Sequence, residues 1–143
     1  EGGNSGIFYR GIEAPELNVI YQSAPEMQVL DNDRHPDAKM GVDGNRTAGS
    51  LYDLIPPRLQ NTRPVGEWNS AEIRIEDGQV QHFQNGEKVV EFQLGTQDWR
   101  ELVAGSKFPG LNPTWVDVPT RGYIGLQDHN DNVWYRNIKL KEL

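Results

Sequence analysis

The sequence predicts an all-β protein with one domain, and three observations lead to this expectation. The 143 residues include fifteen glycines and nine prolines, which interrupt long helices but suit short strands joined by turns. The dipeptides Asp77-Gly78 and Asn85-Gly86 are typical of two-residue β-hairpins, whose central positions need positive φ. At roughly 150 residues per domain, the length predicts a single domain over residues 1–143.

Short runs of apolar or alternating residues predict the individual elements. The two hairpin dipeptides define a three-stranded meander, in which Ala71, Ile73 and Ile75 point to one side of the first strand. In chain order, the expected strands are 7–10, 27–30, 71–76, 79–84, 87–94, 122–127 and 133–143. A short helix or turn is expected over 97–103, and an irregular loop over 31–51.

Several charged residues share a strand face with aliphatic residues. In the last expected strand, Arg136 lies on the same side as Ile138, and Asp128 is in register with Leu126. Together with Arg10, these charges are expected to be buried as pairs or to face a pocket. An arginine fork binds a carboxylate or the hydroxyl pair of a sugar, whereas an Asp128–Arg136 pair would only close the terminal hairpin.

Charge and composition exclude several classes of partner. The formal net charge is -7, which disfavours nucleic acid and anionic membranes and suits a neutral or cationic ligand. No apolar run approaches the ~20 residues that cross a bilayer. The absence of cysteine excludes disulfides and cysteine-ligated metals.

Carboxylates are the best candidates for a reactive site. Glu26 and Gln28 lie on one face of the expected strand 27–30, and Asp31 follows where that strand opens into the long loop. Such a polar row suits a sugar-binding groove, because carboxylates and amides bind vicinal hydroxyls, and a carboxylate pair can act as acid and base. The alternative is an ordinary solvated strand face.

Metal sites and aromatic platforms have only general support from the sequence. His35, His82 and His129 lie far apart in the chain, so only the fold could assemble them. No cofactor is expected, with calcium left open because several loops carry oxygen ligands; these loops are 31–33, Asp43 and 128–131. Four tryptophans could stack on sugar rings or fill the core; they are Trp68, Trp99, Trp115 and Trp134.

Seven motifs together resemble the 3-keto-disaccharide hydrolase domain, long known only as a domain of unknown function. They match in order and spacing over essentially the whole chain, and they are Asn4–Gly11, Glu26–Asn32, Gly49–Asp53, Gly66–Asn69, His82–Gly86, Gly122–His129 and Tyr135–Lys139. The resemblance implies a concanavalin A-like jelly roll of two curved antiparallel sheets with a ligand groove on the concave side. It also implies a secreted or periplasmic bacterial protein with strands before the Asn4 motif, so residues 1–143 are expected to form a domain that is incomplete at its N-terminus.

The family resemblance implies acid/base-assisted cleavage of glycosides that are oxidised at C3 of the sugar. Carried onto matching positions, it implies Glu26, His129 and Asp31 as catalytic residues. The residues implied to bind the substrate are Arg10, Gln28, Asp128, Arg136 and Tyr52.

Three classes of function stay open at this point. The first is an enzyme acting on 3-keto-glycosides, and the second is a glycan-binding module without turnover. The third is an assembly protein, in which a second copy or another chain completes the sheet at a free edge.

Overall fold

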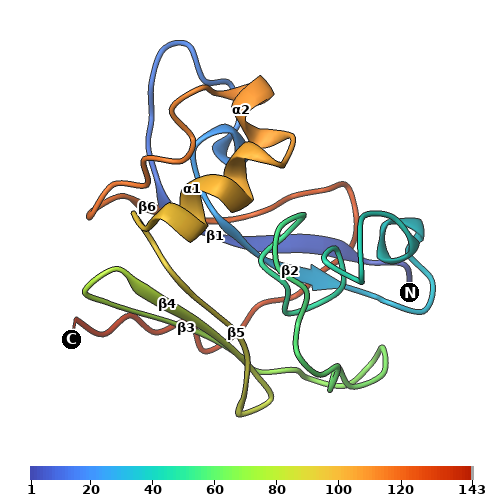
Figure 1. Ribbon diagram of the computed structural model, residues 1–143. Helices are drawn as coiled ribbons and strands as arrows, with labels where there is room; N and C mark the ends of the chain where they lie inside the picture. Colours follow the sequence, from blue (N-terminus) through green and yellow to red (C-terminus); the bar gives the residue numbers. More distant parts are fainter. Residues whose placement is uncertain (143) are drawn as a thin grey trace.

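The computed structural model describes residues 1–142 and contains two antiparallel three-stranded sheets (Figure 1). The first sheet has the order β2-β1-β6, formed by β1 (Asn4–Gly11), β2 (Glu26–Leu30) and β6 (Tyr123–Leu126). In this sheet Phe8 lies opposite Glu26 on one side and opposite Gly125 on the other. The register between β1 and β6 shifts between Phe8 and Gly11, where Arg10 has a φ of 55°.

The second sheet is the meander that the turn dipeptides predict. Its order is β3-β4-β5, with β3 at Ala71–Glu76, β4 at Gln79–Gln84 and β5 at Glu87–Gln93. Both residues of each turn have positive φ, 47° and 80° for Asp77 and Gly78, and 51° and 84° for Asn85 and Gly86. This geometry matches the twist of the flanking strands, which confirms the predicted hairpins.

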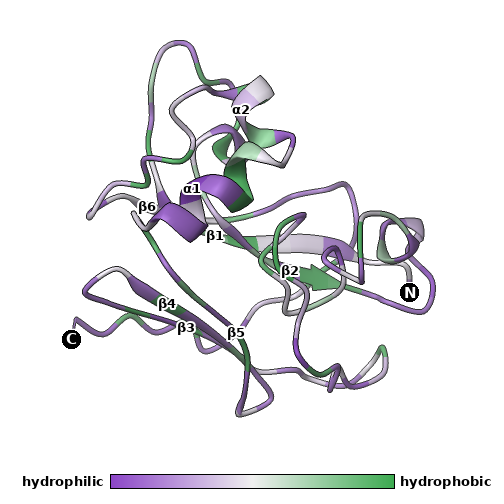
Figure 2. Cartoon of the chain, in the orientation of Figure 1, coloured by the Kyte–Doolittle hydropathy of each residue, from purple (hydrophilic) through white to green (hydrophobic). Residues whose placement is uncertain are grey.

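The main hydrophobic core lies between the second sheet and two short helices. Helix α1 (Gln97–Ala104) begins after the cap Thr96, whose side chain accepts a hydrogen bond from the Trp99 N–H, and α2 (Phe108–Leu111) follows it. In Figure 2, α1 passes from hydrophilic to hydrophobic colour along its length, and the C-terminal end of β2 is hydrophobic. Val89 and Val90 of β5 pack against these helices, which confirms the helix expected over 97–103.

The chain after β6 differs from the expectation. The predicted strand 133–143 is wrong over 133–142, which forms no β-ladder, while Leu143 lies outside the described residues. Alternating apolar residues specify which side a strand would bury, but a strand also needs a hydrogen-bonded neighbour. In this segment Trp134, Ile138 and Leu140 stay exposed.

Residues 1–142 are therefore mostly β, with two antiparallel sheets, two short α-helices and two short 3-10 helices, at Ile20–Gln22 and Pro36–Lys39. The jelly-roll topology and the concave groove stay predictions. Within residues 1–142, no helix has the length and apolar character needed to cross a bilayer.

Candidate functional site

Glu26 shares one face of the first sheet with the apolar Phe8, which lies opposite it on β1. Leu51 forms an isolated bridge with Met27, and the Tyr52 N–H donates to the Glu26 carbonyl oxygen at 3.0 Å. Because residues opposite each other in an antiparallel pair share a face, Tyr52 lies on the Glu26 side of the sheet. Gln28, two residues further along β2, is on the same side.

Gly6 leaves the space that the Glu26 side chain occupies. A Cβ atom built on Gly6 would lie 1.8 Å from Glu26 Oε1 and 2.8 Å from its Cγ, so no larger residue fits there without moving Glu26. On the other side of β1, the Gly6 carbonyl oxygen accepts from the Gln127 N–H at 2.9 Å. Gly6 therefore lies between the Glu26 carboxyl and the segment that leads to His129.

The Glu26 carboxyl is almost fully enclosed, with 6% of the residue exposed. This burial raises its pKa to about 8, while the charge of Lys107 lowers it and that of Asp37 raises it. A buried carboxyl without a cationic partner in contact is stable in its neutral form. At neutral pH, Glu26 is therefore mostly protonated and can donate a proton.

A compact network of charges surrounds Tyr52. Arg46 donates to Asp37 Oδ1 at 3.0 Å and to Asp53 Oδ1 at 2.5 Å, and the Tyr52 hydroxyl donates to Asp37 Oδ2 at 3.0 Å. Lys107 pairs with Asp53 Oδ2 at 3.1 Å, and its Nζ lies 4.6 Å from the centre of the Tyr52 ring. Burial, and then the Asp37 charge, raise the pKa of Tyr52, so its hydroxyl stays a donor.

Two of the predicted acids organise loops. Asp31 Oδ2 accepts from the Gly2 N–H at 2.7 Å, and Asp31 Oδ1 accepts from the N–H groups of Asp33 and Arg34. These hydrogen bonds hold the pKa of Asp31 below its usual range, and the bond from the Gly2 N–H has the largest effect. Asp128 Oδ1 likewise accepts from the Asn130 N–H at 2.9 Å.

The predicted arginines do not join the contacts around Glu26 within residues 1–142. The Arg136 guanidinium lies over the Trp68 ring, 3.9 Å from its centre, instead of pairing with Asp128. Arg10 is partly exposed at the irregular end of β1. Gln28 is almost fully buried, and its Oε1 accepts from the Val29 N–H. The roles of these residues toward a substrate stay predictions.

Two of the four tryptophans fill the core, and the other two are exposed. Trp99 and Trp115 are buried in the core, whereas Trp68 and Trp134 are 43% and 73% exposed. Only the exposed pair is available to stack on a ligand.

His129 lies beside a second histidine that the sequence did not link to it. The rings of His35 and His129 meet edge to face at 6.2 Å, and His129 Nδ1 lies 3.8 Å from Asp131 Oδ2. His35 and Asp37 belong to the loop that follows β2, and the pattern His35-Pro36-Asp37, which follows the predicted strand 27–30 after residues 31–34, is the one local signal that could have indicated them. Arg46, Asp53 and Lys107 carried no such signal.

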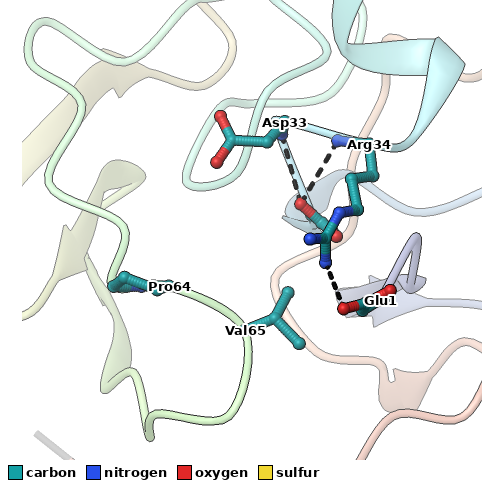
Figure 3. Close-up of a pocket in the computed structure, with 6 residues that line it drawn as sticks. Glu1, Asp33, Arg34, Pro64 and Val65 are labelled. Atoms are coloured by element: carbon teal, nitrogen blue, oxygen red, sulfur yellow. Dashed lines mark hydrogen bonds and ion pairs between the residues drawn. The ribbon is translucent and has the colours of Figure 1, made fainter.

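One pocket borders Asp31, and a second lies elsewhere, against helix α1. One, of about 260 Å³, is lined by Asp31, Asp33, Arg34, Pro64, Val65 and Glu1, and Figure 3 shows Arg34 reaching across to Glu1. The other, of about 300 Å³, lies against Trp99 and Phe92. Glu26 lines neither pocket, so we locate the candidate site by its side-chain chemistry and not by the depth of a cavity.

Comparisons with known proteins agree on one family. The 3-keto-disaccharide hydrolase of Bacteroides thetaiotaomicron is 48% identical over 159 aligned positions, which cover 100% of this chain and 55% of that protein. The chain thus spans about half the length of this curated relative.

Two solved structures from Parabacteroides distasonis ATCC 8503, each described as a "putative glycosyl hydrolase", are also similar. One has a TM-score of 0.79 and 32% identity, and the match covers 90% of this chain and 59% of the other. The second has a TM-score of 0.70 at 22% identity, covering 91% and 66%, and it supports the fold alone. Residues 1–141 match the family described as 3-keto-alpha-glucoside-1,2-lyase-like domain, and the chain therefore belongs to this family.

Proposed function

We propose that this chain contributes a site that cleaves 3-keto-glycosides, with Glu26 as a proton donor. The observation that supports this most is the enclosed Glu26 carboxyl, on the same sheet face as Tyr52 and with a pKa of about 8. A general acid must hold its proton at the working pH and release it to the leaving group, and a carboxyl with a raised pKa meets both needs.

The chemistry follows from the ketone of the substrate. A carbonyl at C3 acidifies the hydrogen at C2, so a base can remove it as a proton. The C2–H electron pair then forms a C1=C2 double bond as the C1–O bond breaks, and the leaving oxygen takes a proton from an acid. Water adding across this double bond gives net hydrolysis. Two proton-transfer groups are therefore needed, and an oxocarbenium ion is not.

Glu26 and His129 share this work in the proposed mechanism. Gly6 separates the Glu26 carboxyl from Gln127, and His129 follows two residues later. Protonated Glu26 donates its proton to the leaving oxygen of the substrate, His129 removes the C2 hydrogen as a proton, and Tyr52 contacts a sugar hydroxyl. Asp31 acts as a positioning residue, because its oxygens already hold the loop that carries His35.

The direct experiment offers the chain two substrates that differ only at C3. We expect release of a free sugar from a 3-keto-disaccharide, followed by NMR, and none from the parent disaccharide, because only the ketone acidifies C2. Equal cleavage of both sugars would contradict the elimination chemistry.

A glycan-binding module is the second candidate, favoured by the exposed Trp68 ring with Arg136 stacked on it. The face of an aromatic ring can stack on the C–H groups of a sugar ring. This alternative predicts saturable binding of both disaccharides and no product from either. An assembly role, with a partner chain at the edge strand β6, has its support in the exposed side chains of Tyr123, Ile124 and Leu126.

A further inference from the structure

Two loops on opposite sides of β1 meet at its first residues. After β2, the Asp31 N–H donates to the Gly3 carbonyl oxygen at 2.9 Å, and after β6, the Gln127 N–H donates to the Gly6 carbonyl oxygen. Because β2 and β6 both run antiparallel to β1, both loops leave the sheet at the same end. One loop carries His35, and the other carries His129 and Asp131.

We propose that His35, His129 and Asp131 form a binding site for a divalent transition-metal ion such as Zn²⁺. One ligand atom from each residue lies within 4.8 Å of the other two. The net charge of -7 favours the approach of a cation to the chain, and Asp131 supplies one carboxylate at the site itself.

The donor set indicates which ions fit. Imidazole nitrogens suit zinc, cobalt and nickel, whereas calcium and magnesium prefer oxygen ligands alone. At metal–nitrogen bonds of about 2.0–2.1 Å, neighbouring donors on a tetrahedral ion lie about 3.4 Å apart, so the most distant ligand atoms must approach by up to about 1.4 Å. The half-exposed side chain of His129 can make this movement by rotation.

Two neighbouring acids already accept backbone hydrogen bonds. Both Asp31 oxygens accept backbone N–H groups, and Asp128 Oδ1 accepts from Asn130. Asp31 and Asp128 are therefore positioning residues, which hold the two loops that carry the ligands. Three protein ligands leave coordination positions open for an oxygen ligand such as water. Coordination uses a ring nitrogen lone pair of His129, so His129 can act as the proposed base only in the metal-free chain, and bound zinc should slow cleavage of a 3-keto-glycoside.

Metal binding also changes a contact at His35. Its Nδ1 accepts from the Asp37 N–H at 3.2 Å, so the neutral ring carries its proton on Nε2. Coordination through Nε2 moves that proton to Nδ1, and coordination through Nδ1 replaces the bond directly. Either way the Asp37 N–H loses its acceptor, so the amide resonance of Asp37 reports binding without any substrate.

The test is calorimetric titration of the untagged chain with ZnCl₂ and, separately, CaCl₂, paired with amide NMR. We expect one saturable zinc site per chain, weaker calcium binding and a shift of the Asp37 amide. His129→Gln and Asp131→Asn should each weaken zinc binding at least tenfold. Asp33→Asn, which removes a nearby exposed carboxylate outside the proposed ligand set, should change it less than twofold.

The proposal is overturned if zinc does not saturate, if calcium binds as tightly, or if His129→Gln and Asp131→Asn bind like the original chain. These measurements use the metal alone. A chain that binds zinc but, in its metal-free form, cleaves no 3-keto-glycoside would therefore contradict the proposed function and leave the metal site standing.

Discussion

Trp115→Ala is expected to lower the free energy of unfolding by about 3–5 kcal/mol, the range for removing a buried aromatic side chain. Trp115 is 2% exposed, and its ring stacks on Phe108 with the ring centres 4.1 Å apart and on Trp99 at 5.8 Å. Its Nε1–H also donates to the Tyr21 carbonyl oxygen at 3.0 Å, which ties the loop before β2 to the core.

Chemical denaturation followed by fluorescence measures this effect. The matched control is Trp134→Ala, since Trp134 is 73% exposed and its loss should change the free energy by less than about 0.5 kcal/mol. Equal effects of the two substitutions would contradict the assignment of Trp115 to the core.

Glu26→Gln is expected to stabilise the protein at neutral pH, by about 3 kcal/mol at pH 7. The pKa of Glu26 rises from 4.5 to about 8 on folding, so between these values the folded chain binds more protons than the unfolded one. The stability of the wild type therefore falls as pH rises through this window and levels off above it. Glutamine has the shape of the neutral carboxyl and cannot ionise, so the variant does not lose stability as the pH rises.

Unfolding free energies at pH 4 and pH 8 check this expectation. The two proteins should differ little at pH 4 and most at pH 8. Glu87→Gln, at the exposed start of β5, should show no comparable difference. If Glu26→Gln were less stable than the wild type at pH 8, the carboxyl would not be held neutral by burial.

Local turn chemistry explains why the second sheet could be predicted from the sequence. Asp77-Gly78 and Asn85-Gly86 fix both hairpins within a few residues, so the strand bounds agree with the structure to within one residue. The prediction of a strand over 133–143 was wrong over 133–142, because an alternating pattern does not show whether a neighbouring strand is available to form hydrogen bonds with its backbone. Pairing between distant segments depends on the whole fold.

The same distinction applies to the site. Glu26, Gln28 and Tyr52 share a sheet face, and period-two alternation predicted this for the first two. The network of Arg46 with Asp37 and Asp53 depends on the path of the irregular loop 31–51, and no periodicity encodes that path. The meeting of His35 with His129 likewise requires β1 to lie between β2 and β6.

Turnover of a 3-keto-disaccharide by Glu26→Gln is the most direct test of the assignment of Glu26. The account predicts a rate at least about 100-fold below that of the wild type, the contribution of a general acid, with Glu87→Gln at the wild-type rate. Unfolding curves on the same samples would show that the variant is folded. A folded Glu26→Gln protein that cleaves the ketone substrate as fast as the wild type would contradict it.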